Sequence, residues 1–405
     1  MARVLFLSNG YGEDAIGSKL ARELIHQCPE LSVQAYPTVD QGRAYEGICP
    51  ILGPRQVMPS GGLLLHSLGM FLNDMRAGFV GMTWRQLREL NKLEADMLIV
   101  VGDVYALSLS LLVTTTARFY VQPLVSAYHQ PKQQTNLNRM TMERFTSLER
   151  YLIRTKVTQM YVRDTLTAQT LSQDGLSQVQ FLGNPMVDGL AATKPLEPMR
   201  LRTLASQADN SGPIIALLPG TRDYAGRSLE VMLAALEQLP NATGVVAWAG
   251  QQLPHLSGWQ AVHHPQAEDD SNNNLHKLTV LHRGARRVLL YQSRFNDVLA
   301  AADMVLGTAG TAHEQAAALG LPVLSFALPP HYTPAFLANQ QRLLADALTI
   351  SSPEPSTLAR GLNDLWHNDH AREGAKASGR ARMGLAGGSS AIAADILSRW
   401  ATIVA

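Results

Sequence analysis

Short apolar runs recur along the chain, and segments with helical periodicity separate them. The first series lies at residues 4–7, 33–36, 97–101, 119–121, 159–162 and 179–182, and the second at 214–218, 244–248, 278–281, 288–291, 304–306 and 323–326. Apolar runs that alternate with helices predict βαβ units and largely parallel sheets. The pattern therefore predicts an α/β protein with two such sheets.

The two series are separated by residues 193–213, which are rich in proline and polar side chains and contain only one short helical piece. A chain of 405 residues suits two domains of about 200 residues each. Residues 391–400 have the spacing of a closing helix that packs back on the first domain. We therefore predict an N-terminal domain at 1–192, a C-terminal domain at 193–385 and a returning helix at 386–405.

Composition and charge exclude several classes of protein. Hydrophobic residues make up 46% of the chain and charged residues 17%, which excludes global disorder. The net charge is only +1, so no overall field attracts nucleic acid. Cys28 and Cys49 allow at most one disulfide, and neither a signal peptide nor a membrane-spanning run is visible. We expect a cytoplasmic protein.

Two segments of the first half leave membrane contact open. Leucines crowd residues 61–72, and residues 131–156 hold six basic against two acidic side chains. An interfacial helix and a basic patch would favour peripheral contact with an anionic membrane. A buried core helix and a solvated surface explain the same residues, so both interpretations stand.

A glycine-containing turn follows the first predicted strand and opens a helix. Gly10 and Gly12 let a ligand approach bare backbone at the helix N-terminus, but their spacing to Gly17 does not match the dinucleotide-binding fingerprint. Glu13 and Asp14 would repel a phosphate, which favours a neutral acceptor here over a nucleotide. A bare turn without a ligand remains the alternative.

Two turns in the second half have the residue types that bind a nucleoside diphosphate. In one, a strand runs into Gly220, Thr221 and Arg222, which supply backbone N–H groups, a hydroxyl and a guanidinium. In the other, small residues let a phosphate approach a helix N-terminus, and Glu314 could accept both hydroxyls of a ribose. The alternative for Glu314 is a plain helix N-terminal charge. The donor-binding residues predicted in this second turn are Gly310, Thr311, Ala312, Glu314 and Gln315.

These turns stand among motifs that resemble one enzyme family. They are Leu-Pro-Gly-Thr-Arg at 218–222, Thr-Ala-Gly-Thr-Ala-His-Glu at 308–314, Gly-Asn-Pro-Met-Val-Asp at 183–188, Tyr-Val-Gln-Pro at 120–123 and Val-Gly-Asp at 101–103. Together they resemble the lipid-A-disaccharide synthase group of GT-B glycosyltransferases over most of the chain.

The resemblance implies two Rossmann-like domains that face a cleft, with a UDP-sugar donor on the C-terminal domain and an acceptor on the N-terminal one. It also implies an inverting transfer without an obligatory metal. The acceptor is expected to be a lipid, a lipid-linked molecule or a saccharide. The chain departs from the family pattern at 9–14 and 124–129, so the acceptor is not specified further.

An inverting transfer needs a base that takes the proton of the acceptor hydroxyl. Asp103 is our predicted base, because it follows an apolar strand and matches the family's motif position; the alternative is a cap for a helix at 105–112. Glu13 and His129 are reserve candidates, and with Gly10 and Gly12 they form the predicted acceptor site.

No metal or resident cofactor is predicted. His263, His264 and His331 have no carboxylate or cysteine at ligand spacing, and the UDP-sugar is a substrate. Two rivals remain: a UDP-GlcNAc 2-epimerase, which shares this fold but needs no acceptor, and a non-catalytic protein that binds nucleotide sugars or lipids.

Overall fold

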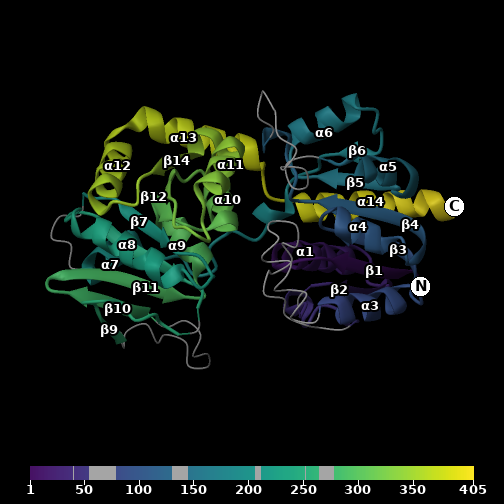
Figure 1. Ribbon diagram of the computed structural model, residues 1–405, viewed down its shortest axis with the longest axis horizontal. Coiled ribbons are helices and arrows are strands. Elements are labelled where there is room, and N and C mark those ends of the chain that lie inside the picture. The colour runs from purple at the N-terminus through teal and green to yellow at the C-terminus, as the bar shows by residue number, and fades with distance from the viewer. Residues whose placement is uncertain (40, 54–78, 130–144, 206–210, 251, 264–277) are drawn as a thin grey trace. The chain divides into compact units, whose positions relative to one another are not determined.

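The computed structural model describes residues 1–39, 41–53, 79–129, 145–205, 211–250, 252–263 and 278–405 (Figure 1). They form two compact units: unit 1 is Met1–Asp188 with Gly384–Ala405, and unit 2 is Gly189–Met383. Both units are α/β, which confirms the predicted fold class. We predict domain boundaries between residues 192 and 193 and between residues 385 and 386. In the structure, the unit boundaries lie between residues 188 and 189 and between residues 383 and 384.

Unit 1 contains, in the described part of the chain, a six-stranded parallel sheet in the order β2-β1-β3-β4-β5-β6. Its strands are β1 Arg3–Ser8, β2 Ser32–Pro37, β3 Glu94–Val101, β4 Thr114–Gln122, β5 Gln159–Val162 and β6 Val179–Gln180. Its helices are α1 Tyr11–Gln27, α3 Phe79–Leu90, α4 Val104–Ser110, α5 Ser147–Lys156, α6 Thr165–Gln173 and α14 Gly388–Val404, with 3-10 turns η1 Arg43–Tyr45, η2 Ala127–His129 and η3 Pro185–Val187.

Both faces of this sheet are buried. Leu5 and Leu7 of β1 belong to a core that helices α3 to α6 cover. Val4 and Phe6, which point the opposite way along the same strand, belong to a second core under α1 and α14. Strands buried on both faces are continuous apolar runs, which is why the sequence pattern finds them.

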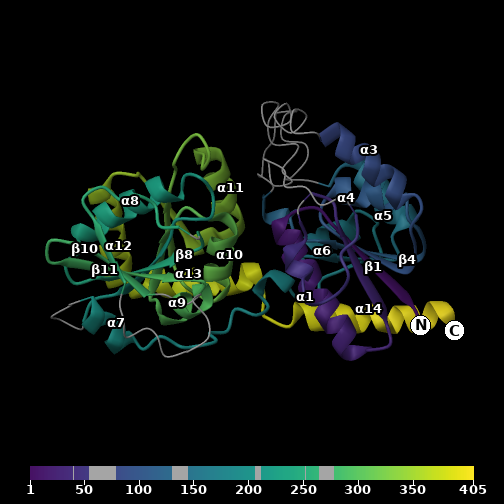
Figure 2. The same ribbon diagram turned by 90° about the horizontal axis from the view of Figure 1, so that it is seen from below.

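The C-terminal helix α14 belongs to unit 1 and runs beside α1 (Figure 1 and Figure 2). Ile392 and Ile396 pack into the core under this face. Asp395 accepts hydrogen bonds from Tyr161 Oη at 2.8 Å and from Gln180 Nε2 at 2.7 Å. These contacts confirm the predicted closing helix that packs back on the first domain.

The Gly-Asn-Pro-Met-Val-Asp motif fastens this returning segment. Asp188 accepts hydrogen bonds from the backbone N–H groups of Gly387 and Ser389, at 2.5 and 2.6 Å, and so caps α14. A Cβ on Gly183 would lie 2.8 Å from Cα of Gly388, so the two backbones touch. The motif therefore has a structural role at the point where the chain re-enters unit 1.

Unit 2 contains a mixed sheet in the order β14-β13-β12-β7-β8-β11-β10-β9. Its strands are β7 Ile214–Leu218, β8 Thr243–Trp248, β9 Gln260–His263, β10 Leu278–Arg283, β11 Arg286–Gln292, β12 Met304–Gly307, β13 Val323–Phe326 and β14 Leu348–Ser351. Its helices are α7 Pro198–Leu204, α8 Ala225–Glu237, α9 Phe295–Ala301, α10 Gly310–Ala318, α11 Pro334–Leu344, α12 Pro355–His367 and α13 Asp369–Met383, with a 3-10 turn η5 Ala345–Ala347.

One edge of this sheet departs from the expected parallel pattern. Strand β10 pairs antiparallel with both β9 and β11. Strands β10 and β11 are joined through Gly284, which has a φ of +57°, and so short a connection permits only an antiparallel hairpin. The remaining neighbours of this sheet pair in parallel.

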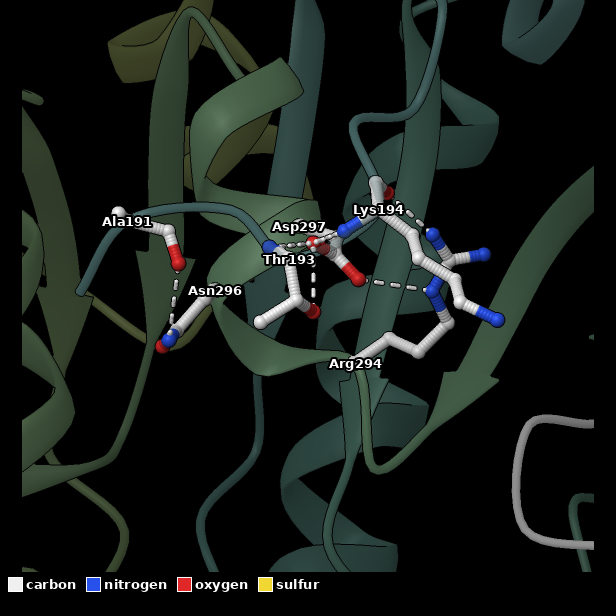
Figure 3. A network of polar contacts seen from close by, with 6 residues as sticks. All are labelled: Ala191, Thr193, Lys194, Arg294, Asn296 and Asp297. Carbon is white, nitrogen blue, oxygen red and sulfur yellow. Dashed lines mark hydrogen bonds and ion pairs between the residues drawn. The ribbon is translucent and has the colours of Figure 1, made fainter. Parts of the chain in front are cut away.

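The segment that enters unit 2 is tied to the start of α9 (Figure 3). Asp297 is buried and accepts hydrogen bonds from the N–H groups of Thr193 and Lys194 at 2.8 and 2.9 Å, and from Arg294 Nε at 2.9 Å. Asn296 donates to the carbonyl of Ala191 at 3.3 Å. The start of the predicted linker at 193–213 is thus part of unit 2, and the described residues of that segment include α7.

Burial alone would raise the pKa of Asp297, but hydrogen bonds from Lys194 and Arg294 hold it below its ordinary value. Asp297→Asn is therefore expected to lower the free energy of unfolding by about 1–2 kcal/mol at pH 7. A carboxyl group whose pKa is lower in the folded than in the unfolded protein stabilises the fold at pH values above the unfolded pKa of about 3.9. This contribution is lost as the pH falls through the folded pKa. The difference from wild type should shrink in denaturant melts at acid pH, whereas a constant difference would contradict this role. Asp364→Asn, at an exposed site on α12, is the control.

The segments predicted to contact a membrane fall wholly or partly outside the described residues, since these exclude 54–78 and 130–144. Across the described part of the chain, no helix has both the length and the apolar character that crossing a bilayer requires.

Candidate functional site

The topology of unit 1 places the predicted base beside the first glycine turn. Strand β1 lies between β2 and β3. The chain therefore runs from β1 to β2 on one side and then crosses to β3 on the other side of β1. In open parallel sheets, ligands bind outside the carboxyl ends of the strands at such a switch point. Asn9 and Gly10 follow β1 directly, and Asp103 follows β3.

Asp103 caps helix α4. Its Oδ1 accepts hydrogen bonds from the N–H groups of Tyr105 at 2.9 Å and Ala106 at 3.3 Å, and from Asn9 Nδ2 at 2.7 Å. A Cβ on Gly102 would lie 1.8 Å from Asn9 Oδ1, so only glycine admits this pairing. The cap considered in the sequence analysis is therefore real, although α4 ends at Ser110. All three bonds go to one carboxylate oxygen, so the cap does not preclude a role as base.

Three carboxyl groups with raised pKa values gather around this switch point. Desolvation raises the pKa of Glu13 to about 7, and the charge of Asp103 adds to the effect. Burial also raises the pKa of Asp103, against the hydrogen bonds that it accepts. Glu149 on α5 has a pKa of about 7 for the same reason, and it accepts a hydrogen bond from Tyr120 Oη at 2.8 Å. The charge of Asp103 thus contributes to the raised pKa of both glutamates.

The other predicted acceptor residues are placed differently. The carboxyl group of Glu13 lies against Gly10, where a Cβ would approach its Oε2 to 2.4 Å, and Gly12 faces open space. His129 is buried in η2, a segment that packs against α6. The structure therefore links Asp103 to Asn9 by a hydrogen bond and to Glu13 by charge, and it places His129 on a segment that contacts α6.

Asp14 and Gly17 have structural roles in this turn. Ser8 Oγ donates to Asp14 Oδ1 at 2.5 Å and lies 3.1 Å from Tyr45 Oη. A Cβ on Gly17 would meet that same Tyr45 oxygen at 1.9 Å. Gly17 therefore makes room for a tyrosine, in agreement with the failed dinucleotide spacing.

The topology of unit 2 brings the two predicted donor turns together in the same way. Strand β7 lies between β8 and β12, which makes the β7/β12 boundary its switch point. The turn at 219–224 follows β7, and the turn at 308–309 follows β12. Two motifs that are about ninety residues apart in sequence thus occupy adjacent strand ends.

Side chains clamp the two turns to each other. Tyr224 Oη donates to the carbonyl of Thr308 at 3.1 Å, and Thr308 Oγ1 donates to the carbonyl of Pro219 at 3.2 Å. The hydroxyls of Ser228 and Thr308 are also hydrogen-bonded to each other. These buried contacts fix the position of one turn relative to the other.

The clamped turns present donor groups outward. Thr221 and Arg222 are exposed, and Gly220 has a φ of +90°. The N-cap residue of α10, Ala309, has no capping side chain of its own, and Gly310, Thr311 and Ala312 contribute backbone N–H groups at this N-terminus. A helix N-terminus and a guanidinium on two adjacent turns suit a diphosphate. Glu314 and Gln315 follow in the same helix, both partly exposed.

Several residues of this region escaped sequence reasoning. Tyr224 and Ser228 lie just beyond the quoted motif, and their contacts with Thr308 have no local signature. His331, considered only as a metal ligand, stacks on Tyr224, and its Nε2 lies 3.5 Å from Oδ2 of Asp223.

No group of three or more potential metal ligands occurs in the described residues. A surface cavity lined by Ala242, Arg360 and Trp366, among others, contains none of the predicted donor residues.

Comparison with known proteins gives the fold. No protein-family model and no curated protein matches the chain. The calicheamicin glycosyltransferase CalG4 is 15% identical over 100% of this chain and 99% of its own, with a TM-score of 0.64. A putative UDP-N-acetylglucosamine 2-epimerase from Listeria monocytogenes is 16% identical over 99% and 97%, with a TM-score of 0.59. MnaA of S. aureus, solved with UDP, is 14% identical over 100% and 98%, with a TM-score of 0.57. The chain thus has the two-unit α/β fold of GT-B glycosyltransferases and UDP-sugar epimerases.

Proposed function

We propose that the protein is an inverting glycosyltransferase that uses a UDP-sugar donor. Unit 2 binds the nucleotide, and unit 1 binds an acceptor with a free hydroxyl. The acceptor oxygen attacks the anomeric carbon while the bond from that carbon to the diphosphate breaks. No metal is required, because backbone N–H groups and a guanidinium can neutralise the leaving charge.

The observation that carries this proposal is the clamped pair of turns in unit 2. The N-terminus of α10 and the Arg222 side chain offer an anion site, and Glu314 is on the first turns of the same helix. A diphosphate with an attached ribose needs this combination of charge, N–H groups and a hydroxyl acceptor. Two of the structural neighbours are described by their names as using or binding UDP compounds, which supports uridine as the nucleoside.

In this mechanism Asp103 takes the proton of the acceptor hydroxyl. It lies at the carboxyl end of β3, and its raised pKa makes it a stronger base than an ordinary aspartate. The resemblance to the lipid-A-disaccharide synthase group favours a lipid or lipid-linked acceptor. Together with the leucine-rich segment at 61–72, it supports a peripheral position on the cytoplasmic face of an anionic membrane.

A UDP-GlcNAc 2-epimerase is the second candidate, because the Listeria neighbour bears that name and matches over nearly the whole chain. An epimerase converts UDP-GlcNAc without an acceptor, whereas a transferase releases UDP only when a hydroxyl, or water in its place, attacks. Incubation with UDP-GlcNAc alone, followed by separation of the sugar epimers, distinguishes the two. Appearance of the 2-epimer would favour this second candidate.

UDP is expected to stabilise the protein more than GDP or TDP does. At a ligand concentration one hundred times the dissociation constant, linkage gives about 2.7 kcal/mol. Thermal melts with the three nucleotides, at equal concentrations and without added metal, provide the measurement. Strong stabilisation by GDP or TDP without an effect of UDP would contradict the assignment of the nucleoside.

A further inference from the structure

His313 is buried beneath the donor turn, on the first turn of α10, with no exposed surface. Its Nε2 lies 3.3 Å from the backbone N of Ala309, the residue that precedes the helix. Its Nδ1 lies 3.2 Å from Oε1 of Gln340, on α11. The imidazole therefore bridges the backbone of the turn and a second helix.

The hydrogen bonds around this ring determine where its proton is. Gln340 Nε2 donates to the carbonyl of Gly310 at 2.7 Å, which leaves Oε1 of the same amide as an acceptor. Tyr332 Oη donates to this Oε1 at 2.8 Å and also lies 3.3 Å from His313 Nδ1, which is itself 3.2 Å from Oε1. Because the Tyr332 hydrogen goes to Oε1, Nδ1 is placed to donate to the same oxygen. At the opposite end, the N–H of Ala309 can only donate, so Nε2 accepts.

The network holds the backbone groups that flank the peptide bond between Ala309 and Gly310, where the turn enters helix α10. Ala309 N–H and Gly310 C=O are held by His313 and Gln340, both of which are buried. The ring is pressed against the turn as well, because a Cβ on Gly307 would lie 2.5 Å from Nε2. With these two groups turned inward, the N–H groups of residues 310–312 are left for a ligand.

We propose that His313 is a positioning residue for donor binding, and that Gln340 and Tyr332 hold it as the neutral Nδ1–H tautomer. It does not touch the donor, and it acts through the backbone of residues 309–310. The identity of the ligand as UDP rests on the proposed function, whereas the tautomer and the backbone contact do not. Desolvation lowers the pKa of His313 to about 4, in agreement with a neutral ring.

The tautomer is measured on the unliganded protein. In nitrogen-15 NMR of selectively labelled histidine at pH 7, the ring signal that vanishes in His313→Gln should be that of a neutral imidazole with a protonated Nδ1 and an unprotonated Nε2. A protonated Nε2, or an imidazolium, would overturn the proposal because neither can accept from Ala309 N–H.

Two variants of similar size separate positioning from packing. In His313→Gln, the amide oxygen is as many bonds from Cβ as Nε2 is in histidine, so it can accept from the N–H of Ala309. In His313→Asn, the amide oxygen is only as far from Cβ as Nδ1 is, so it does not reach this N–H. We expect the Asn variant to raise the Kd for UDP about tenfold, equivalent to about 1.4 kcal/mol, and the Gln variant to stay close to wild type. Leu362→Val, which removes a buried methylene on α12, is the control for general destabilisation.

Amide hydrogen exchange of Ala309 provides a readout without UDP. Faster exchange in His313→Asn than in His313→Gln supports the proposal, and equal exchange in both overturns it. Equal UDP affinities in all three proteins would overturn it as well. If wild type does not bind UDP, the proposed function fails, and the tautomer and exchange results still decide the role of His313.

Discussion

Asp103→Asn is expected to lower the rate of sugar transfer by about 10²- to 10⁴-fold, the usual contribution of a general base. The affinity for UDP should stay close to wild type, because the predicted donor residues belong to unit 2. Asparagine is a good N-cap, so its oxygen can still accept from the N–H groups of Tyr105 and Ala106. The substitution therefore removes the basic oxygen while it keeps α4. Release of UDP from a UDP-sugar, with acceptor or with water alone, measures the loss.

Asp164→Asn is the matched control for this experiment. Asp164 also follows a strand of unit 1 and caps a helix, but its two oxygens accept from Thr167 N–H at 2.7 Å and Ser126 Oγ at 2.7 Å. The same substitution there should leave kcat near wild type. Full activity in Asp103→Asn would move the base to Glu13 or His129, and loss of UDP affinity together with activity would indicate damage to the fold.

The raised pKa values set the expected pH dependence of the same reaction. A raised pKa means that the basic carboxylate is lost as pH falls, and at a higher pH than for an ordinary aspartate. A plot of kcat/KM against pH should therefore show its acid limb at a higher pH than an ordinary aspartate would give. In Asp103→Asn the remaining activity should lose much of this acid limb.

Periodicity predicts the buried strands of this fold well, because parallel strands covered on both faces are continuous apolar runs. It fails for β9, which is exposed along its length, and for β14, whose middle residues are exposed. The antiparallel pairing of β10 with β11 was foreseeable from the short gap between the two runs. The prediction of largely parallel sheets did not take into account that the two runs are too close for a crossover helix between them.

Local motifs locate the turns of the candidate site, but not what holds them. Thr308 and His313 stand within a motif that sequence analysis singled out, yet their partners Tyr224 and Gln340 come from other segments. The pairing of Asn9 with Asp103 likewise joins residues that are 94 positions apart. Such contacts depend on strand order, which neither periodicity nor spacing specifies.

Arg222→Ala and Glu314→Gln test the donor site directly. Loss of the guanidinium removes a charge-assisted contact of about 1.5–3 kcal/mol, which corresponds to a roughly 10- to 150-fold increase in the Kd for UDP. Glu314→Gln removes the charge that strengthens hydrogen bonds from the ribose hydroxyls, and the loss should fall at the lower end of this range. Isothermal titration with UDP and with uridine separates the two, since the arginine effect should disappear when the phosphates are absent and the glutamate effect should persist.

Arg227→Ala, on an exposed position of α8, controls for the change in net charge and should leave the Kd for UDP unchanged. The double variant Arg222→Ala, Glu314→Gln should lose close to the sum of the single effects, because the two side chains would contact different parts of the ligand. Near-wild-type affinity in both single variants would show that the β7/β12 switch point is not the nucleotide site. In that case the clamp between Tyr224 and Thr308 would serve only to hold the sheet of unit 2 together.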